Sequence, residues 1–445
     1  MFDLIIIGGG PGGAEAAKVA ARGGLRVALC EARALGGTCL QEGCIPTKAL
    51  LYAAKIKNNA AHGSAYGVTA QAAIDHPAAI ARKDKLVAKL TAGLGATLKQ
   101  CGVTVLPLRA TVTGREGEMW QVAAGEETIT APRLLIATGS RPATPPIPGL
   151  AEALAADTAW TSTQALEANE VPEQLAIIGG GVIGLELASY YNAAGSRVTV
   201  LERLPAIGGP LDADAAAVLR RNLVKQGIAI ATEVEVTAVR EDSVTYIEKG
   251  QEKILTARVL CCTGRVPCAD GLGLEGFLDT KRGLPTDARG RTSVPGLWAI
   301  GDVTGGILLA HVAARQGLAA AHDMLGVTDA ADEPVPAIIY TSPEVACVGL
   351  TLAQAQEQGI EARAVRKPMG FSGRFMAENE GGDGFAKAVI GPDDRLLGLT
   401  MVGNGASEAL MAAAVMIAQG MTIHQIAKLI FPHPTVGEMM REVCE

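Results

Sequence analysis

The chain has 445 residues, with 39 Lys and Arg against 46 Asp and Glu, for a formal net charge of −7. Hydrophobic residues make up 49% of it, which excludes a disordered chain, and the length favours two to four domains. The acidic balance, without a run of five basic residues, argues against a nucleic acid or an anionic membrane as partner.

Nine cysteines, an odd number, do not form the pattern of a secreted disulfide framework. The N-terminus runs into an apolar strand without a basic region, so we expect no signal peptide. The longest uncharged apolar run, residues 409–418, is too short to span a bilayer. We therefore expect a cytoplasmic protein in which any disulfide is catalytic or regulatory.

An internal repeat dominates the organisation of the chain. Residues 4–31 and 175–202 align with an offset of 171 residues, with their glycines and a closing glutamate in register. Each copy reads as an apolar strand, a Gly-rich turn, an Ala-rich helix and a second apolar strand. This pattern predicts two βαβ units, each in a parallel sheet covered on both faces.

The other expected elements follow in chain order. They are helices over 47–60 and 77–100, strands within 103–130 and 134–140, a Pro-rich linker at 141–149, a helix over 212–226, strands up to 259–267, a buried strand at 296–303 and a helix over 307–325. The last 110 or so residues alternate strands and helices without nucleotide-binding glycines, which indicates a separate α+β domain.

The first Gly-rich turn, residues 8–13, fits G-x-G-x-x-G between a strand and a helix. Gly8 permits the turn, Gly10 lets the backbone approach a pyrophosphate, and Gly13 allows close packing of helix on strand. The helix N-terminus favours the phosphates, and Glu31 is placed to bind ribose hydroxyls. We expect a dinucleotide site; a tight turn in an α/β core is the alternative.

The second copy repeats this arrangement with Gly179, Gly181, Gly184 and Glu202. Two such sites imply two dinucleotides, which a protein uses to bring two redox rings together. Glu202 favours NAD over NADP because a carboxylate repels a 2′-phosphate. Arg203 follows directly and favours the opposite, so NADP stays open.

Cys39 and Cys44 form a C-x4-C pair that can reach disulfide distance if the chain turns into a helix between them, and Gly43 eases that turn. A thiolate near a helix N-terminus is stabilised and nucleophilic. The pair supplies only two metal ligands without a nearby Cys or His, so we expect no metal. Two buried structural cysteines are the alternative.

Several motifs carry a resemblance to a known family. GGTCLQEGCIPTK (36–48) resembles the redox-disulfide motif of the FAD-dependent pyridine nucleotide–disulfide oxidoreductases, GLWAIGDV (296–303) their second flavin motif, and FPHPTVGE (431–438) their C-terminal histidine motif. Residues 373–390 and 397–410 resemble the interface domain of the dihydrolipoamide dehydrogenase branch. The resemblance implies an α/β fold with two Rossmann-like domains and a C-terminal α+β dimerisation domain. Its implied boundaries are 1–145 and 269–334 for the FAD domain, 146–268 for the NAD domain and 335–445 for the dimerisation domain.

The resemblance also implies the residues that bind each cofactor. Those for FAD are Gly8, Gly10, Gly13, Glu31, Gly37, Thr38, Lys48, Ala110, Thr138, Gly139, Asp302 and Ala310. Those for NAD are Gly179, Gly181, Gly184, Glu186, Glu202 and Gly264. Lys48 is expected to pair with Glu186 and to stabilise negative charge near the flavin; a solvated helix lysine is the alternative.

The same resemblance assigns the chemistry. It implies that Cys44 faces the flavin, Cys39 exchanges with the substrate, His433 is the acid–base and Glu438 orients it. A turn between His433 and Glu438 is needed for them to meet, so we expect a cis His433–Pro434 bond. His62, His76, His322 and His424 are expected to be structural, and His311 is given no chemistry.

The activity implied is oxidation of dihydrolipoamide by NAD⁺ through a Cys39–Cys44 disulfide and FAD. It is implied for a homodimer in which His433 reaches the disulfide of the other subunit. The lipoyl group would come from a partner protein of a 2-oxoacid dehydrogenase or glycine cleavage complex. Alternatives are a related reductase of another disulfide or of a metal ion, and a flavin-bound redox-sensing or partner subunit.

The chain departs from the branch at a few positions. Gln41 and Glu42 stand where an Asn and an apolar residue are usual, and we expect Glu42 to face solvent. Cys268 replaces a usual Asn, and the neighbours Cys261 and Cys262 are expected in a core strand. Cys444 is expected to be an inert tail residue, with a third redox thiol as the alternative.

Overall fold

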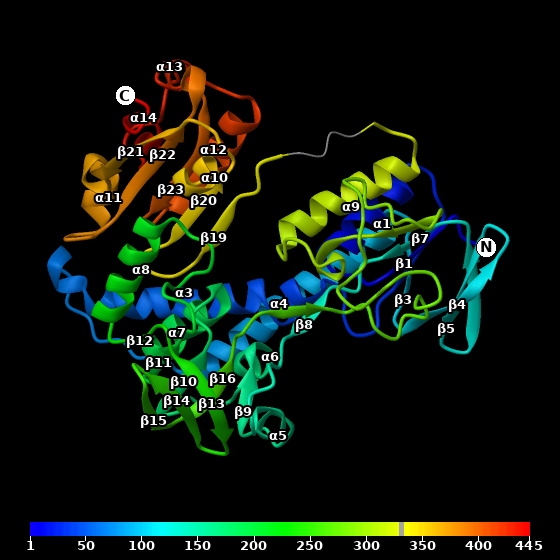
Figure 1. The fold of residues 1–445 in the computed structure, drawn as a ribbon, viewed down its shortest axis with the longest axis horizontal. Coiled ribbons are helices and arrows are strands. Elements are labelled where there is room, and N and C mark those ends of the chain that lie inside the picture. The colour runs from blue at the N-terminus through cyan, green and yellow to red at the C-terminus, as the bar shows by residue number, and fades with distance from the viewer. Residues whose placement is uncertain (329–332) are drawn as a thin grey trace. The chain divides into compact units, whose positions relative to one another are not determined.

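The computed structural model describes residues 1–328 and 333–445 (Figure 1). It consists of two compact units. Unit 1 comprises Met1–Ala49, Ile80–Ala143 and Gly264–Asp332, and unit 2 comprises Leu50–Ala79, Thr144–Thr263 and Glu333–Glu445. Residues 329–332, near the end of the predicted second FAD segment, lie outside the described residues.

Unit 1 is built on a five-stranded parallel sheet of order β18-β7-β1-β2-β3. Its strands are β1 (Leu4–Ile7), β2 (Val27–Cys30), β3 (Thr104–Leu106), β7 (Leu134–Ile136) and β18 (Leu297–Ala299). Helices α1 (Pro11–Arg22) and α9 (Ala310–Met324) pack tightly on each other, since a Cβ on Gly317 would lie 2.3 Å from the Gly12 oxygen. Glycine is therefore required at this helix crossing.

Smaller elements complete unit 1. An antiparallel sheet contains β4 (Ala110–Glu116), β5 (Met119–Ala124) and β6 (Glu127–Ala131), and a two-stranded ribbon pairs β8 (Ser140–Pro142) with β17 (Arg265–Pro267). The helices are α2 (Gly37–Gln41), α3 (Cys44–Ala61), α4 (His76–Gln100) and the 3₁₀ turn η2 (Gly301–Thr304), with α3 and α4 contributing residues to unit 2 as well.

The second parallel sheet, in unit 2, has the order β12-β11-β10-β16-β9. Its strands are β9 (Ala159–Thr161), β10 (Gln174–Ile178), β11 (Arg197–Leu201), β12 (Ala229–Ala231) and β16 (Arg258–Cys261). Leu175 pairs with Val198 here as Leu4 pairs with Val27 in unit 1, so the two βαβ units share one register. The predicted repeat and its parallel sheets are confirmed.

This part of unit 2 contains further helices and strands. They are η1 (Gly63–Tyr66), α5 (Leu150–Ala155), α6 (Ser162–Glu167), α7 (Val182–Ala194), α8 (Ala213–Lys225) and the antiparallel strands β13 (Glu235–Arg240), β14 (Ser243–Glu248) and β15 (Gln251–Thr256).

The C-terminal part of unit 2 is an antiparallel sheet of order β19-β20-β23-β22-β21 covered by helices. Its elements are β19 (Ala337–Ile339), β20 (Val345–Gly349), α10 (Leu352–Glu357), β21 (Arg363–Pro368), η3 (Met369–Phe371), α11 (Gly373–Glu378), β22 (Phe385–Ile390), η4 (Pro392–Asp394), β23 (Leu396–Val402), α12 (Ala406–Ala418), α13 (Ile423–Ile426), η5 (Val436–Glu438) and α14 (Met439–Glu442). The predicted α+β fold of this segment is confirmed. No helix among the described residues is both long and apolar enough for a membrane span.

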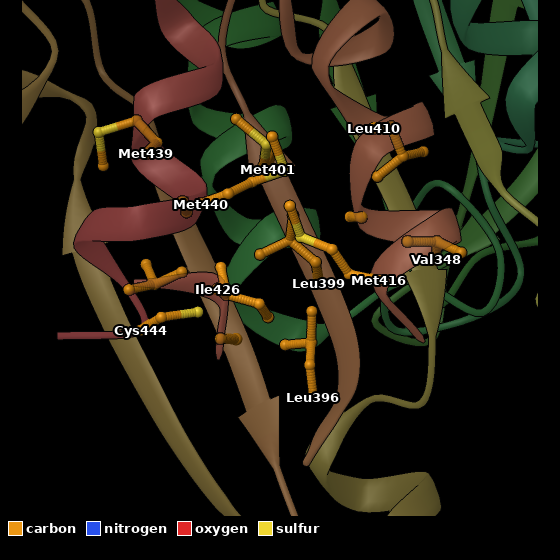
Figure 2. Close-up of a cluster of buried hydrophobic side chains, with 14 of the residues drawn as sticks. Val348, Leu396, Leu399, Met401, Leu410, Met416, Ile426, Met439, Met440 and Cys444 are labelled. Carbon is orange, nitrogen blue, oxygen red and sulfur yellow. The ribbon is translucent and has the colours of Figure 1, made fainter. Parts of the chain in front are cut away.

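Cys444 belongs to the core of this C-terminal sheet. Figure 2 shows its side chain in the buried cluster that also contains Ile426 and Met440. It is 6% exposed, and burial raises the pKa of its thiol to about 11. The thiol is enclosed in this apolar cluster, where a substrate thiol cannot reach it, so the structure favours a packing role for Cys444 over a redox role.

Cys444→Ala is expected to lower the free energy of unfolding by about 1–2 kcal/mol, because it leaves a small cavity in the core. Native Cys444 should also resist alkylation until the protein unfolds. Denaturant titration and a timed alkylation experiment test both points, with Cys268→Ala as the control outside the cluster. Rapid native alkylation of Cys444 would contradict the packing role.

Candidate functional site

The two predicted redox cysteines lie at neighbouring helix starts in unit 1. Cys39 is in α2, and Cys44 is the first residue of α3. Both are free thiols. A hydrogen bond with Cys44, reinforced by burial, raises the pKa of Cys39, while the ammonium of Lys48 opposes this shift. The two thiols therefore interact directly, with the proton retained on Cys39, and the disulfide between them stays a prediction.

The helix that carries Cys39 begins directly against the first Gly-rich turn. The Gly36 N–H donates to the Gly9 oxygen at 2.8 Å. A Cβ on Gly37 would lie 2.8 Å from the Cα of Gly10, so only glycine allows this backbone approach. The thiols and the predicted FAD turn are thus parts of one local structure.

The first Gly-rich turn has the geometry of a dinucleotide cradle. Gly8 has φ +109°, and a Cβ on Gly13 would lie 1.9 Å from the Gly8 oxygen. Beside Gly10, by contrast, an added methyl group would have its nearest neighbouring atom 3.9 Å away, which leaves room for a phosphate. The Glu31 carboxylate accepts from the Gly9 N–H at 2.7 Å and is fixed beside the turn. These residues fit an FAD pyrophosphate and ribose.

The second turn repeats that cradle in unit 2. Gly179 has φ +105°, a Cβ on Gly184 would lie 2.3 Å from the Gly179 oxygen, and one on Gly181 would meet nothing within 4 Å. Glu202 accepts from the Gly180 N–H at 2.6 Å and from the Leu204 N–H at 2.7 Å. The open space beside Gly181 and the fixed carboxylate fit NAD. Gly264 also borders open space, whereas Arg203 is an exposed side chain.

This difference between Gly181 and Gly184 gives a matched pair of variants. Gly181→Ala is expected to leave the melting temperature unchanged and to raise KM for NAD⁺ at least about tenfold, because its methyl group occupies the phosphate space. Gly184→Ala is expected to destabilise the domain by about 2–4 kcal/mol, because its methyl group overlaps the Gly179 oxygen. Thermal unfolding and NAD⁺ kinetics on both variants test this; an unchanged KM in Gly181→Ala would contradict the cradle.

Thr38 and Asp302, both predicted at the flavin, lie in one hydrogen-bonded network in unit 1. The Ser140 hydroxyl donates to Asp302 Oδ2 at 2.5 Å and accepts from Arg265 Nε at 2.7 Å. Arg265 Nη2 donates to the main-chain carbonyl oxygen of Ser140 at 2.7 Å and to Thr38 Oγ1 at 3.3 Å. Ser140 and Arg265 were not predicted from the sequence. The signal for them was the pair of similar segments ATGSRP and CTGRVP, each directly after a buried strand.

Four further residues that were predicted to bind FAD also lie in unit 1. The Thr138 hydroxyl donates to the Cys268 oxygen at 2.7 Å, and the Cys268 N–H donates to the Gly139 oxygen at 2.9 Å. Ala110 is buried at the start of β4, and Ala310 is the first residue of α9. Cys268 contributes only backbone groups to these bonds, so its substitution for Asn leaves them intact.

His433 and Glu438 are brought together by the turn that was predicted between them. His433 Nδ1 lies 2.9 Å from Glu438 Oε1, and the His433–Pro434 bond is cis, as expected. The Thr435 N–H donates to Glu438 Oε2 at 2.8 Å. This backbone bond and the His433 contact hold the pKa of Glu438 below its usual value. The imidazole is 77% exposed on the described chain, so its orientation comes from Glu438 rather than from burial.

Glu186 is 3% exposed, and its carboxylate accepts from the Tyr340 N–H at 3.0 Å within unit 2. Lys48 belongs to unit 1, and its pairing with Glu186 stays a prediction. Within the described ranges, His, Cys, Asp and Glu form no group of three or more that could hold a metal ion.

The expectation that Glu42 faces solvent is wrong. Its carboxylate accepts from both Nη1 and Nη2 of Arg33 at 2.9 Å, and its side chain is only 10% exposed. Loop 31–36 folds back over the segment between the thiols and brings Arg33 to this position, which the sequence pattern does not reveal.

Comparison with known proteins agrees with this geometry. The pyridine nucleotide–disulphide oxidoreductase family model matches residues 2–317, and the dimerisation domain of that family matches residues 335–444. The chain is 37% identical to a dihydrolipoyl dehydrogenase of Thermus scotoductus over 100% of this chain and 97% of the relative. It is 38% identical to one of Cupriavidus necator over 99% and 97%.

Solved structures share this fold over nearly the whole chain. LpdA from Mycobacterium tuberculosis aligns with a TM-score of 0.90 at 27% identity, covering 99% of both chains. The HOCl-induced flavoprotein disulfide reductase RclA from Escherichia coli aligns with a TM-score of 0.87 at 28% identity, again covering 99% of both chains.

The fold and these matches define a two-dinucleotide flavoprotein oxidoreductase. The chain belongs to the pyridine nucleotide–disulphide oxidoreductase family, and its cofactors are FAD and NAD. Within the family it is similar over its whole length to dihydrolipoyl dehydrogenases.

Proposed function

We propose that the protein is a dihydrolipoyl dehydrogenase, which oxidises dihydrolipoyl groups to lipoyl groups and reduces NAD⁺. The observation that carries the proposal is the 35–38% identity to three dihydrolipoyl dehydrogenases over 97–98% of their lengths. Such a reaction needs a pair of thiols, an acid–base and two dinucleotide sites. The candidates for these are the interacting thiols of Cys39 and Cys44, the His433–Glu438 pair and the two Gly-rich cradles.

In this proposal Cys39 exchanges with the dihydrolipoyl thiol, and Cys44 is the thiol on the flavin side. FAD, when bound, supplies two-electron transfer between thiols and nicotinamide. His433 takes the substrate proton through Nε2, because Nδ1 is held by Glu438. Glu438 fixes the tautomer and stabilises the charged imidazole. Lys48, paired with Glu186, stabilises negative charge near the reacting groups.

Cofactor residues follow the same proposal. Gly8, Gly10, Gly13 and Glu31 hold the adenosine diphosphate part of FAD, with further contacts from Gly37, Thr38, Ala110, Thr138, Gly139, Asp302 and Ala310. Gly179, Gly181, Gly184, Glu186, Glu202 and Gly264 hold NAD. Residues 1–145 and 269–334 then form the FAD domain, 146–268 the NAD domain and 335–445 the dimerisation domain.

The chain carries the dimerisation domain of its family. We further propose a homodimer in which His433 acts on Cys39 of the partner subunit, since a largely exposed catalytic imidazole needs a second surface to complete its site. The lipoyl group would be carried by a protein of a 2-oxoacid dehydrogenase or glycine cleavage complex, in the cytoplasm.

An assay with purified, FAD-loaded protein tests the proposal. Dihydrolipoamide with NAD⁺ is expected to give rapid NADH formation, and the same assay with NADP⁺ is expected to be much slower. FAD-loaded protein that is inactive here but reduces another disulfide or a metal ion would favour the alternative reductase. FAD-loaded protein with no turnover on any of these would favour a redox-sensing or partner subunit.

A further inference from the structure

Two consecutive side chains between the thiols bind the loop that follows β2. Gln41 Nε2 donates to the Leu35 oxygen at 2.7 Å and to Thr91 Oγ1 at 2.8 Å. Glu42 accepts two hydrogen bonds from the Arg33 guanidinium, each 2.9 Å long. We call the Arg33–Glu42 pair and the Gln41 contacts the thiol clamp. Its two members between the cysteines are the positions at which the sequence departs from the usual family pattern.

The clamp joins the thiol segment to the ribose-binding carboxylate. The backbone N–H of Arg33 donates to Glu31 Oε1 at 2.8 Å, while its side chain holds Glu42. Bidentate pairing of a guanidinium with a carboxylate fixes direction as well as distance. The Glu42 side chain is only 10% exposed and the Arg33 side chain 67% exposed, so the carboxylate is shielded from water while the guanidinium reaches it from the surface.

We infer that Arg33 and Glu42 are positioning residues for the Cys39–Cys44 pair, an inference that rests on the proposed function. The pair holds the segment between the cysteines so that their sulfurs stay close. It thereby raises the effective concentration of each thiol toward the other and favours the disulfide over the dithiol. Neither residue touches the reacting atoms.

The charges predict unequal effects for the two partners. Arg33→Met leaves a largely buried carboxylate without the Arg33 cation, whereas Glu42→Gln keeps the shape and removes the charge. The double variant Arg33→Met/Glu42→Gln removes the stranded charge as well. Its disulfide is therefore expected to be less destabilised than that of Arg33→Met alone. If the two substitutions only added structural damage, the double variant would instead be the more affected one.

The test is a redox equilibration of the full-length, FAD-loaded protein with reduced and oxidised dithiothreitol. In this exchange the Cys39–Cys44 bond breaks, two electrons and two protons pass to the cysteines, and dithiothreitol closes its own disulfide. Alkylation and mass spectrometry of the peptide that contains both cysteines give the equilibrium constant. We expect the equilibrium constant to shift toward the dithiol, by about fivefold in Arg33→Met and by about twofold in both Glu42→Gln and the double variant.

Arg26→Met is the matched control. Arg26 also binds Asp3 in a bidentate way, through Nε and Nη2 at 2.9 and 3.0 Å, but that pair lies where β1 and β2 begin, whereas the Gly-rich turn and loop 31–36 follow the ends of these strands. No shift is expected there. If wild type forms the disulfide and the equilibrium constant of Arg33→Met equals that of Arg26→Met, the clamp alone is overturned. If wild type forms no Cys39–Cys44 disulfide, the proposed function and the clamp are overturned together. If Arg33→Met loses FAD, the near-isosteric variant Glu42→Gln is used instead. An equilibrium constant of Glu42→Gln equal to that of Arg26→Met then overturns the clamp.

Discussion

Cys44→Ser is expected to lower NAD⁺-linked oxidation of dihydrolipoamide by at least about 10³-fold, because a hydroxyl cannot form the disulfide through which the substrate's electrons leave. NADH–quinone activity, which needs bound FAD but no thiol, is expected to remain within about threefold of wild type. Both rates are measured on one preparation with its FAD content determined.

Cys268→Ser is the control for this substitution, because Cys268 contributes only backbone bonds near the predicted flavin site. It should leave both activities near wild type. An equal loss of thiol-linked and quinone activity in Cys44→Ser would contradict the assignment of Cys44 to the path between substrate and flavin.

His433→Gln carries the second large effect, a loss of about 10²- to 10⁴-fold in dihydrolipoamide oxidation, since the substrate thiol then lacks its proton acceptor. FAD binding and NADH–quinone activity should be unaffected. His424→Gln is the matched control, because His424 is also an exposed histidine next to a carboxylate, with Nε2 3.1 Å from Asp394. A wild-type rate in His433→Gln would contradict its role.

The pH dependence of the His433–Glu438 pair follows from Glu438. Its pKa lies below the usual value, so the carboxylate stays charged at neutral and mildly acid pH. The stabilisation from this pair is present above the unfolded pKa of Glu438 and is lost as the pH falls through the lower folded value. Glu438→Gln should therefore reduce activity about tenfold across the neutral range, whereas in wild type protonation of Glu438 itself should cause no loss of activity near pH 5. A pH–rate profile of both proteins measures this.

The βαβ repeat was predictable because its determinants are local. The glycines at 8, 13, 179 and 184 have no room for a side chain, and the strand before each turn contains an apolar run, residues 4–7 in β1 and 175–178 in β10. The helix predicted over 307–325 begins later, at Ala310. Leu309 is in an extended conformation, with φ −128° and ψ 134°, after Gly305 and Gly306, so the apolar pattern began before the helix did.

The side-chain networks were not predictable in the same way. Ser140 meets Arg265 and Asp302 across 125 and 162 positions of sequence. The antiparallel pairing of β8 with β17 brings Arg265 to Ser140, and the parallel strands β7 and β18, which end just before Ser140 and Asp302, bring those two together. The position of Glu42 depends on the path of loop 31–36, which hydrophobic periodicity does not encode. The contact between His433 and Glu438, five residues apart, was predictable because a proline-containing turn is a local feature of the sequence.

Counting alkylatable thiols after anaerobic addition of NADH to the oxidised, FAD-loaded protein tests the central claim most directly. We predict that Cys39 and Cys44 change from a disulfide to two reactive thiols while the other seven of the nine cysteines keep their reactivity. If NADH reduces the flavin and the Cys39–Cys44 peptide does not change, the claim that these two thiols exchange electrons with the flavin is wrong.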